Sequence, residues 1–199
     1  MDLKLYKPTD IEIWINKQYQ SSGINYASDL DIKRIAELFN IELHIYDGNS
    51  LADWSDESYQ FILLNGNHDE MKRRVEFFHE LCHPLRHTGN QDVMSKAFME
   101  LQEMQAEQFQ YYAAMPIYML EEFKCVSPSL LTKIMAEEFM LPEKFVERRL
   151  DQVKRRIQIG RQDAERQERI KNPVKVDMAH VRRVMEEFGR RQRERQSAY

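Results

Sequence analysis

The sequence has 199 residues, 42% of them hydrophobic and 31% charged, with a formal net charge of −4, which predicts one compact domain of ordinary size with an appendage. It contains no run of 18 uncharged apolar residues and no apolar run of signal-peptide length at its start, so we expect neither a membrane span nor a secretion signal. Two cysteines, Cys82 and Cys125, are too few for a disulfide framework, which indicates a reducing, cytoplasmic setting.

Two helices are predicted at the start of the chain. Thr9 or Asp10 can cap a first helix that runs through residues 11–20 and stops at a Ser-Ser-Gly run. Ser28 or Asp29 can open a second helix. The apolar residues on one side of this helix are Leu30, Ile32, Ile35, Ala36 and Phe39. The first helix is expected to pack on the core rather than to take part in chemistry.

Two β-strands are predicted next, separated by a polar segment. Residues 41–46 alternate as a half-buried strand does, whereas residues 59–65 form a short apolar run. Residues 48–58, between them, are expected to form a turn region. A strand beside a peptidase site commonly aligns the substrate backbone by edge pairing. The strand 59–65 therefore either lines a cleft or is an ordinary core strand.

A helix is predicted from about residue 68, and it contains His79-Glu80-Leu81-Cys82-His83. Residues i and i+4 of a helix lie on one face, so His79 and His83 can direct two imidazoles at one metal ion, with Glu80 beside a metal-bound water. Neutral imidazoles suit zinc, zinc lowers the pKa of bound water to about 7, and a carboxylate accepts the proton as the water attacks. The spacing predicts a zinc hydrolase site, although three fixed positions also occur by chance in polar surface helices.

Pro84 interrupts the helical pattern directly after the second histidine. A proline inside a helix lacks the N–H for the carbonyl four residues back, here that of Glu80, and clashes with it, at a cost of about 3 kcal/mol or more. We therefore expect a kink or a loosened last turn after His83. His87 then either lines the site or is an alternative metal ligand. Its spacing differs from the pattern His-Glu-x-x-His-x-x-Gly-x-x-His.

A catalytic zinc needs a third protein ligand and an open fourth position, and Glu103 is the candidate. A turn-rich break follows His83, so a second helix over about residues 94–114 can fold back against the first. The small Ala106 allows close approach, and Glu107, one turn after Glu103, can accept the outer N–H of a ligating histidine. The predicted core positions of this helix are Phe98, Leu101, Phe109 and Tyr112. Taken alone, Glu103 is equally described as a solvated helix carboxylate.

Four segments together resemble the ImmA/IrrE family of metallopeptidases. They are Phe61-Ile62-Leu63-Leu64-Asn65, the run from Arg73 to His87, the run from Glu103 to Phe109, and Ala114-Met115-Pro116. The resemblance covers roughly residues 28 to 150. It implies that His79, His83 and Glu103 hold one zinc ion and that Glu80 is the general base. One departure is visible, because the family's usual Ala-Asn or Ala-Asp step is Ala106-Glu107 here.

The resemblance also implies a fold class and a substrate. The implied fold is α+β, a small zincin-like metallopeptidase domain in which a short sheet packs on the helix of the two histidines and on a second ligand-bearing helix. Helical C-terminal extensions follow this domain. For the ImmA branch, the resemblance implies cleavage of a phage-type or mobile-element repressor, which relieves repression.

The C-terminal part is predicted to be helical and basic. Residues 127–156 contain two short helices with a tight join, which suggests helix-turn-helix geometry, although the second helix mixes glutamates with its basic residues and so favours packing or partner docking over base readout. Residues 148–195 carry a net charge of +8 and the rest of the chain −12. The predicted parts are a metallopeptidase domain over 1–126, a helix-turn-helix-like segment over 127–156 and a basic helical tail over 157–199.

Two classes of function remain open. The first is a cytoplasmic endopeptidase that holds one zinc ion per chain and cuts a repressor protein. The second is a DNA-binding or partner-binding regulator whose metal motif is vestigial, and the basic tail favours it because such charge can meet nucleic acid or an acidic surface. A solvated helix with charges of both signs is another explanation of the tail. Nucleic acid is the less favoured partner, and no membrane partner is expected.

Overall fold

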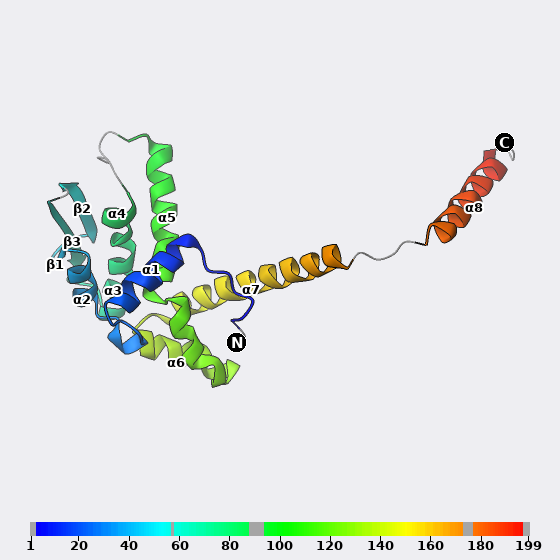
Figure 1. Ribbon diagram of the computed structural model, residues 1–199. Coiled ribbons are helices and arrows are strands. Elements are labelled where there is room, and N and C mark those ends of the chain that lie inside the picture. Colours follow the sequence, from blue (N-terminus) through cyan, green and yellow to red (C-terminus); the bar gives the residue numbers. More distant parts are fainter. Residues whose placement is uncertain (1–2, 57, 88–93, 173–176, 197–199) are drawn as a thin grey trace. The chain divides into compact units, whose positions relative to one another are not determined.

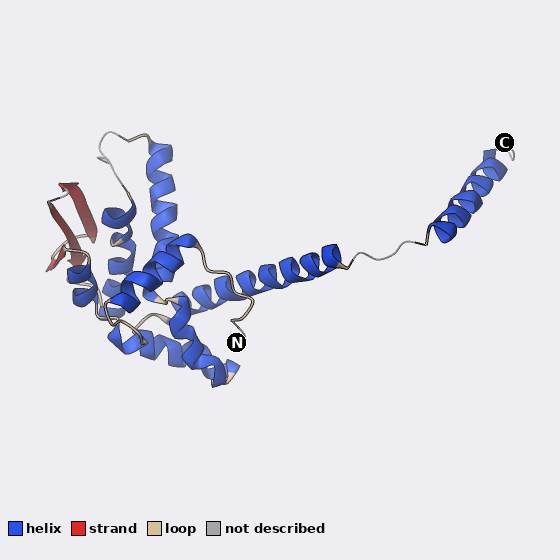
Figure 2. Ribbon diagram, viewed as in Figure 1, coloured by secondary structure: helices blue, strands red, loops and turns tan. Residues whose placement is uncertain are grey.

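In the computed structural model of the protein, residues 3–56, 58–87, 94–172 and 177–196 are described. The helices are α1 (Asp10–Ser21), the 3₁₀ turn η1 (Ala27–Asp29), α2 (Ile32–Leu38), α3 (Glu70–Glu80), α4 (Cys82–Arg86), α5 (Lys96–Ala114), the 3₁₀ segment η3 (Ile117–Cys125), α6 (Pro128–Phe139), α7 (Glu143–Lys171) and α8 (Met178–Gln196). The strands are β1 (Ile41–Tyr46), β2 (Leu51–Asp56) and β3 (Tyr59–Asn65). A small sheet with helices around it is the predicted α+β class (Figure 2).

The three strands form one sheet in the order β1-β3-β2 (Figure 1). β1 runs parallel to β3, with Ile41 opposite Gln60, and β2 runs antiparallel to β3. β2 corrects our expectation of a turn over residues 48–58: its sequence lacks an alternating apolar pattern, and its pairing with β3 makes it a strand. β3 lies between the other two strands, so it is the core strand of our two alternatives, and β2 is the edge strand.

The first helix begins as predicted and the second begins later. The side chain of Thr9 accepts the amide hydrogen of Glu12, whose carboxylate accepts the amide hydrogen of Thr9, which is a capping box. The cap of α2 is Asp31 and not Ser28 or Asp29, because Asp29 accepts backbone hydrogens of the turn that precedes it. The segment that we predicted as one helix is therefore divided into η1 and α2.

Helices α3, α4 and α5 lie beside the sheet (Figure 1). The predicted helix of the two histidines is broken at Leu81, between α3 and α4. We expected a distortion after His83, and the break lies before it, because Pro84 has no amide hydrogen to offer the carbonyl of Glu80. Leu81 nevertheless keeps helical backbone angles, with φ −59° and ψ −27°. The two histidines therefore keep their helical spacing across the break.

Helix α5 folds back against α3, as predicted, and Ala106 is fully buried. Of its four predicted core positions, Phe109 is buried and Tyr112 packs against the core. The prediction was wrong for Phe98 and Leu101, which are each 46% exposed. Both lie in the first turns of α5, which extend beyond the five-residue helix α4 in Figure 1.

Helices α6 and α7 are joined at Met140, which has φ 53° and lets the amide of Leu141 reach back to the carbonyl of Ala136. Their buried apolar residues are Met135, Ala136, Phe139, Phe145, Val146, Leu150 and Val153. The chain divides into two compact units, Met1–Gln158 and Ile159–Tyr199, and α7 continues past the end of its apolar pattern. The boundaries that we predicted after residues 126 and 156 stay predictions. Within the described ranges, no helix is both long and apolar enough to cross a membrane.

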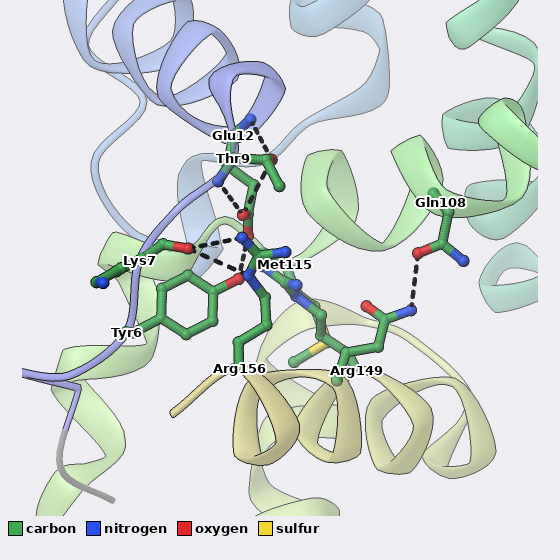
Figure 3. Close-up of polar contacts among 9 residues, drawn as sticks. Tyr6, Lys7, Thr9, Glu12, Gln108, Met115, Arg149 and Arg156 are labelled. Atoms are coloured by element: carbon green, nitrogen blue, oxygen red, sulfur yellow. Dashed lines mark hydrogen bonds and ion pairs between the residues drawn. The ribbon is translucent and has the colours of Figure 1, made fainter. Parts of the chain in front are cut away.

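A buried ion pair joins α1 to α7 (Figure 3). Arg149 is 0% exposed and donates to Oε1 of Glu12 at 2.8 Å and to the carbonyl of Met115 at 3.2 Å. Its guanidinium lies over the ring of Tyr112, and the hydroxyl of Tyr6 donates to the same carboxylate. Burial alone raises the pKa of Glu12, but the charge of Arg149 and the hydrogen bonds that the carboxylate accepts outweigh it and hold this pKa below its ordinary value. Arg149 therefore stabilises the packing of α1 on α7.

Candidate metal centre

Side chains from three helices meet beside the sheet. Helix α3 contributes His79, α4 contributes His83 and α5 contributes Glu103, and one possible ligand atom of each lies within 4.8 Å of the other two. Nε2 of His79 lies 3.2 Å from Oε2 of Glu103, and Nε2 of His83 lies 3.7 Å from Oε1 of the same carboxylate. The structure thus brings together the three residues that we predicted as metal ligands. Their role as ligands stays a prediction.

The packing of α3 and α4 holds the two imidazoles in place. Phe77, Phe78 and Leu81 are fully buried between or beside the two histidines. His83 is itself only 4% exposed, whereas His79 is half-buried. The buried apolar residues anchor the inner face of this segment, so that the rings of His79 and His83 lie on one side, with their centroids 5.5 Å apart.

The donor set fits a divalent metal such as zinc. Two neutral imidazole nitrogens and one carboxylate are a set that catalytic zinc takes from proteins, with bonds of about 2.0–2.2 Å. Atoms that share one tetrahedral metal at such distances lie roughly 3.4 Å from each other. The separations of 3.2 and 3.7 Å between the histidine nitrogens and the oxygens of Glu103 are on either side of that value. The three residues can therefore hold one ion without a large rearrangement.

The surroundings shift the pKa values of two residues in the predicted motif. Burial, followed by the charges of His87 and His79, lowers the pKa of His83 to about 3, so His83 is neutral near pH 7 and has a free lone pair. Burial, followed by the charge of Glu103, raises the pKa of the Glu80 carboxyl to about 7. A carboxyl that titrates near neutral pH can both accept and return a proton.

The ring of His83 has neighbours on two elements besides its own helix. The indole of Trp54 in β2 stacks on it, with centroids 5.0 Å apart and the planes 12° from parallel. Nδ1 of His83 lies 3.1 Å from Nδ1 of His87, and Nε2 of His87 lies 3.2 Å from Oε1 of Gln105 in α5. His87 is 6% exposed and lines the site, as one of our two alternatives for it held.

Sequence reasoning did not identify Trp54 or Gln105. Trp54 lies in the segment that we predicted to be a turn, and Gln105 is only two positions after Glu103, which places it on a different side of the helix. No spacing rule marks either residue, because the sheet pairing brings in Trp54 and the fold of the chain after His83 brings in Gln105.

The two other glutamates of the prediction differ in position. Glu80 accepts a hydrogen bond from the backbone amide of Ala52, so its carboxylate lies beside β2. Glu107 is exposed, and the outer nitrogen of His83 faces His87. The role that we predicted for Glu107 stays a prediction, with His87 in the position that such a hydrogen-bond partner takes.

Comparison with known proteins relates most of this unit to one family. Residues 30–151 match the peptidase family M78, described as the IrrE N-terminal-like domain. The phage-like element PBSX protein XkdA of Bacillus subtilis (strain 168) is 35% identical over 149 residues, which cover 73% of this chain and 74% of XkdA. The protein YqaB of the same organism is 28% identical over 115 residues, which cover 58% of this chain and 66% of YqaB. The matched range includes every residue that we predicted for the site.

Proposed function

The chain belongs to the ImmA/IrrE family of metallopeptidases, and from this premise we propose that it is a zinc-dependent endopeptidase. The observation that carries the proposal is the meeting of His79, His83 and Glu103, with Glu80 adjacent to the first histidine. Family membership supports a metal-dependent peptidase. The choice of zinc and the roles of these individual residues are our proposal.

In this proposal, His79, His83 and Glu103 hold one zinc ion per chain, and Glu80 is the general base. Bound zinc supplies a Lewis acid that polarises the scissile carbonyl and makes water acidic. Glu80 takes a proton from the attacking water onto its carboxylate and then gives it to the leaving amine nitrogen. Its pKa of about 7 suits both transfers. The lowered pKa of His83 keeps its imidazole neutral and able to donate a lone pair.

The substrate backbone adds to the edge strand β2. β2 pairs with β3 on one side, and in the part of the chain that the structure describes its other side has no strand partner. Ala52 in this strand bonds to Glu80, and Trp54 stacks on His83, so β2 runs beside the proposed catalytic groups. Pairing along an edge strand fixes an extended peptide by main-chain hydrogen bonds. It would hold the scissile bond at a constant position relative to Glu80.

The proposed substrate is a phage-type or mobile-element repressor, and its cleavage relieves repression. XkdA, which resembles this chain, is named as a protein of a phage-like element, and this supports a role in such an element. A cytoplasmic protease without selectivity would damage its own cell. We therefore propose that the enzyme cuts one or a few bonds of the repressor and leaves casein-like substrates largely intact.

Co-expression tests this function directly. The protein is produced together with the repressor encoded beside it, and the fragments are identified by mass spectrometry, with Glu80→Gln as the matched inactive control. We expect fragments with the wild type only, and one zinc ion per chain in both proteins. An uncut repressor beside zinc-loaded wild type would refute the substrate. Purified wild type that binds no zinc would refute the metallopeptidase proposal itself.

The alternative function, a DNA-binding or partner-binding regulator, is favoured by the arginines of α8. Five of them, Arg182, Arg183, Arg190, Arg191 and Arg193, are exposed. Exposed guanidinium groups can neutralise phosphates, and affinity of this origin falls steeply as salt rises. A salt-dependent gel shift without proteolysis by the full chain selects this alternative.

A further inference from the structure

Three polar side chains form a chain of contacts that leads from the proposed metal site to α5. Nε2 of His83 faces Glu103, and Nδ1 on the other side of the ring lies 3.1 Å from Nδ1 of His87. On the far side of the second ring, Nε2 lies 3.2 Å from Oε1 of Gln105. Each separation is a hydrogen-bond distance, and each contact needs one donor and one acceptor.

The proton positions in this chain of contacts depend on one another. A neutral imidazole carries one hydrogen, so it donates from one nitrogen and accepts at the other. If Gln105 accepts through its oxygen, His87 carries its hydrogen on Nε2 and accepts at Nδ1. His83 then donates from Nδ1 and keeps a lone pair on Nε2, on the side of Glu103. If the amide of Gln105 is turned and donates instead, the order reverses, and the hydrogen of His83 lies on Nε2, where a metal cannot bind.

We propose that Gln105 is a positioning residue that accepts a hydrogen bond from His87 and thereby fixes the tautomer of His83 that binds metal. This inference rests on the proposed zinc site. Histidine ligands commonly donate their outer N–H to a protein acceptor, and the loss of that acceptor typically costs 10–100-fold in metal affinity or activity. Gln105 acts one residue further out, because it decides whether His87 is able to accept.

The fold holds His83 and His87 firmly enough for this coupling. His87 follows directly after α4, where its φ of −109° and ψ of 143° leave the helix, and its amide donates to the carbonyl of His83 at 2.9 Å. Both rings are more than nine-tenths buried, and Trp54 covers one face of His83. Gln105 is exposed and lines a groove of about 350 Å³ between α4, α5 and α1, so water can reach the end of the chain of contacts.

Three variants of Gln105 test the proposal on the full chain, with zinc affinity measured by chelator competition. Gln105→Met keeps the length of the side chain, removes the acceptor and excludes water, so we expect zinc to bind about 10–100-fold more weakly. Gln105→Ala admits water as a substitute acceptor, so we expect a smaller loss. Gln105→Glu can only accept, so we expect binding no weaker than that of the wild type. The control is Gln108→Met, an exposed glutamine of the same helix that lines the same groove.

Nitrogen NMR of the zinc-loaded protein supplies a readout that a general loss of packing would not move. The ¹⁵N shifts of His87 show which ring nitrogen carries the hydrogen. We expect Nε2 in the wild type and in Gln105→Glu, and a mixture of the two tautomers in Gln105→Met. A wild type with the hydrogen on Nδ1 would overturn the proposed direction of the hydrogen bonds.

The outcomes separate this inference from the proposed function. If the wild type binds zinc and Gln105→Met binds it equally well, the positioning role is refuted and the zinc site stands. If Gln108→Met weakens binding as much as Gln105→Met does, the effect belongs to the groove and the role is also refuted. If the wild type binds no zinc, the proposed function itself fails.

Discussion

Two carboxylates of the site, Glu80 and Glu103, have different surroundings and therefore different expected roles. Glu80 lies against β2, where the amide of Ala52 donates to it and burial raises its pKa to about 7. Glu103 is 52% exposed and faces both histidines with its two oxygens. A carboxylate whose oxygens face two imidazole nitrogens suits a ligand, whereas a buried carboxyl that titrates near pH 7 suits proton transfer.

We predict that Glu80→Gln retains zinc and loses about 10²-fold or more in turnover. The amide keeps the size of the side chain and cannot take a proton, and a positioned base contributes roughly 10²- to 10⁴-fold. Single-turnover cleavage of the repressor and metal analysis on the same preparation check both parts. Full activity of Glu80→Gln would contradict the mechanism.

We predict that Glu103→Ala abolishes tight zinc binding, whereas His87→Ala still binds close to one zinc ion per chain. Removal of Glu103 leaves two ligands, while His87 contacts His83 through the outer nitrogen and not through the nitrogen that faces Glu103. Metal analysis after dialysis against a weak chelator measures the difference. Glu100→Ala, which removes an exposed carboxylate one turn earlier on α5, is the control. The reverse order of the two main variants would make His87 the third ligand.

At the scale of whole elements, the packing of α1 on α7 depends on the ion pair between Glu12 and Arg149. Both side chains are at most 1% exposed, so each charge is balanced mainly by the other and by a few hydrogen bonds. Removing one partner of such a pair leaves an uncompensated buried charge, whereas replacing both with apolar residues of similar size is often neutral or stabilising.

We predict that Glu12→Gln lowers the free energy of unfolding by about 3–5 kcal/mol, because it leaves the charge of Arg149 buried and unpaired. The double variant Glu12→Leu with Arg149→Met should recover most of this loss. Urea unfolding followed by circular dichroism measures each value. Asp151→Ala, which breaks an exposed pair with Lys154 on the same helix, should change little. Equal losses in the Glu12 and Asp151 variants would contradict the argument.

The same pair predicts a dependence of stability on pH. The pKa of Glu12 is lower in the folded protein than its ordinary value of about 4.5, so its contribution is fully present above that value and is lost as the pH falls through the folded pKa. Between about pH 5 and pH 3, the wild type should therefore lose more stability than the double variant Glu12→Leu with Arg149→Met. Unfolding curves at several pH values in this interval measure the difference, and parallel curves for the two proteins would contradict it.

At the scale of the whole molecule, the chain combines a compact unit that holds the candidate site with a charged helical unit. All the proposed ligands and the proposed base lie in the unit Met1–Gln158. The unit Ile159–Tyr199 contains the exposed arginines of α8 together with exposed apolar residues of the same helix, Met178, Val184, Met185 and Phe188. Such a helix offers charged and apolar contacts to a partner protein without a direct part in the chemistry.

We predict that removal of residues 172–199 slows cleavage of the repressor and leaves zinc content at one ion per chain, because no proposed ligand lies in that range. Cleavage rates and metal analysis of the shortened and full chains measure the two effects. Replacement of Arg190, Arg191 and Arg193 by Ser tests whether charge is responsible, since a contact of that kind weakens as salt rises. Loss of zinc from the shortened chain would show that the tail supports the site itself.

The sequence by itself determined the elements whose local pattern is strong. The alternation of β1, the apolar run of β3, the capped start of α1 and the i, i+4 histidines could all be predicted, because each depends on residues close together in the chain. The candidate third ligand, Glu103, was found through the known needs of a zinc site and through the family resemblance. Local pattern alone would have left it an ordinary helix carboxylate.

Only the tertiary structure decided the features that depend on distant pairing. Leu51–Asp56 became a strand because β3 offers it hydrogen bonds, and this strand brought Ala52 to Glu80 and Trp54 to His83. Gln105 meets His87 because the chain leaves α4 at that residue and α5 folds back beside it. Arg149, predicted among the basic residues of an interaction helix, is buried against Glu12, 137 positions earlier. No local rule carries such information, because hydrogen bonds and ion pairs of this kind exist only once separate elements have packed together.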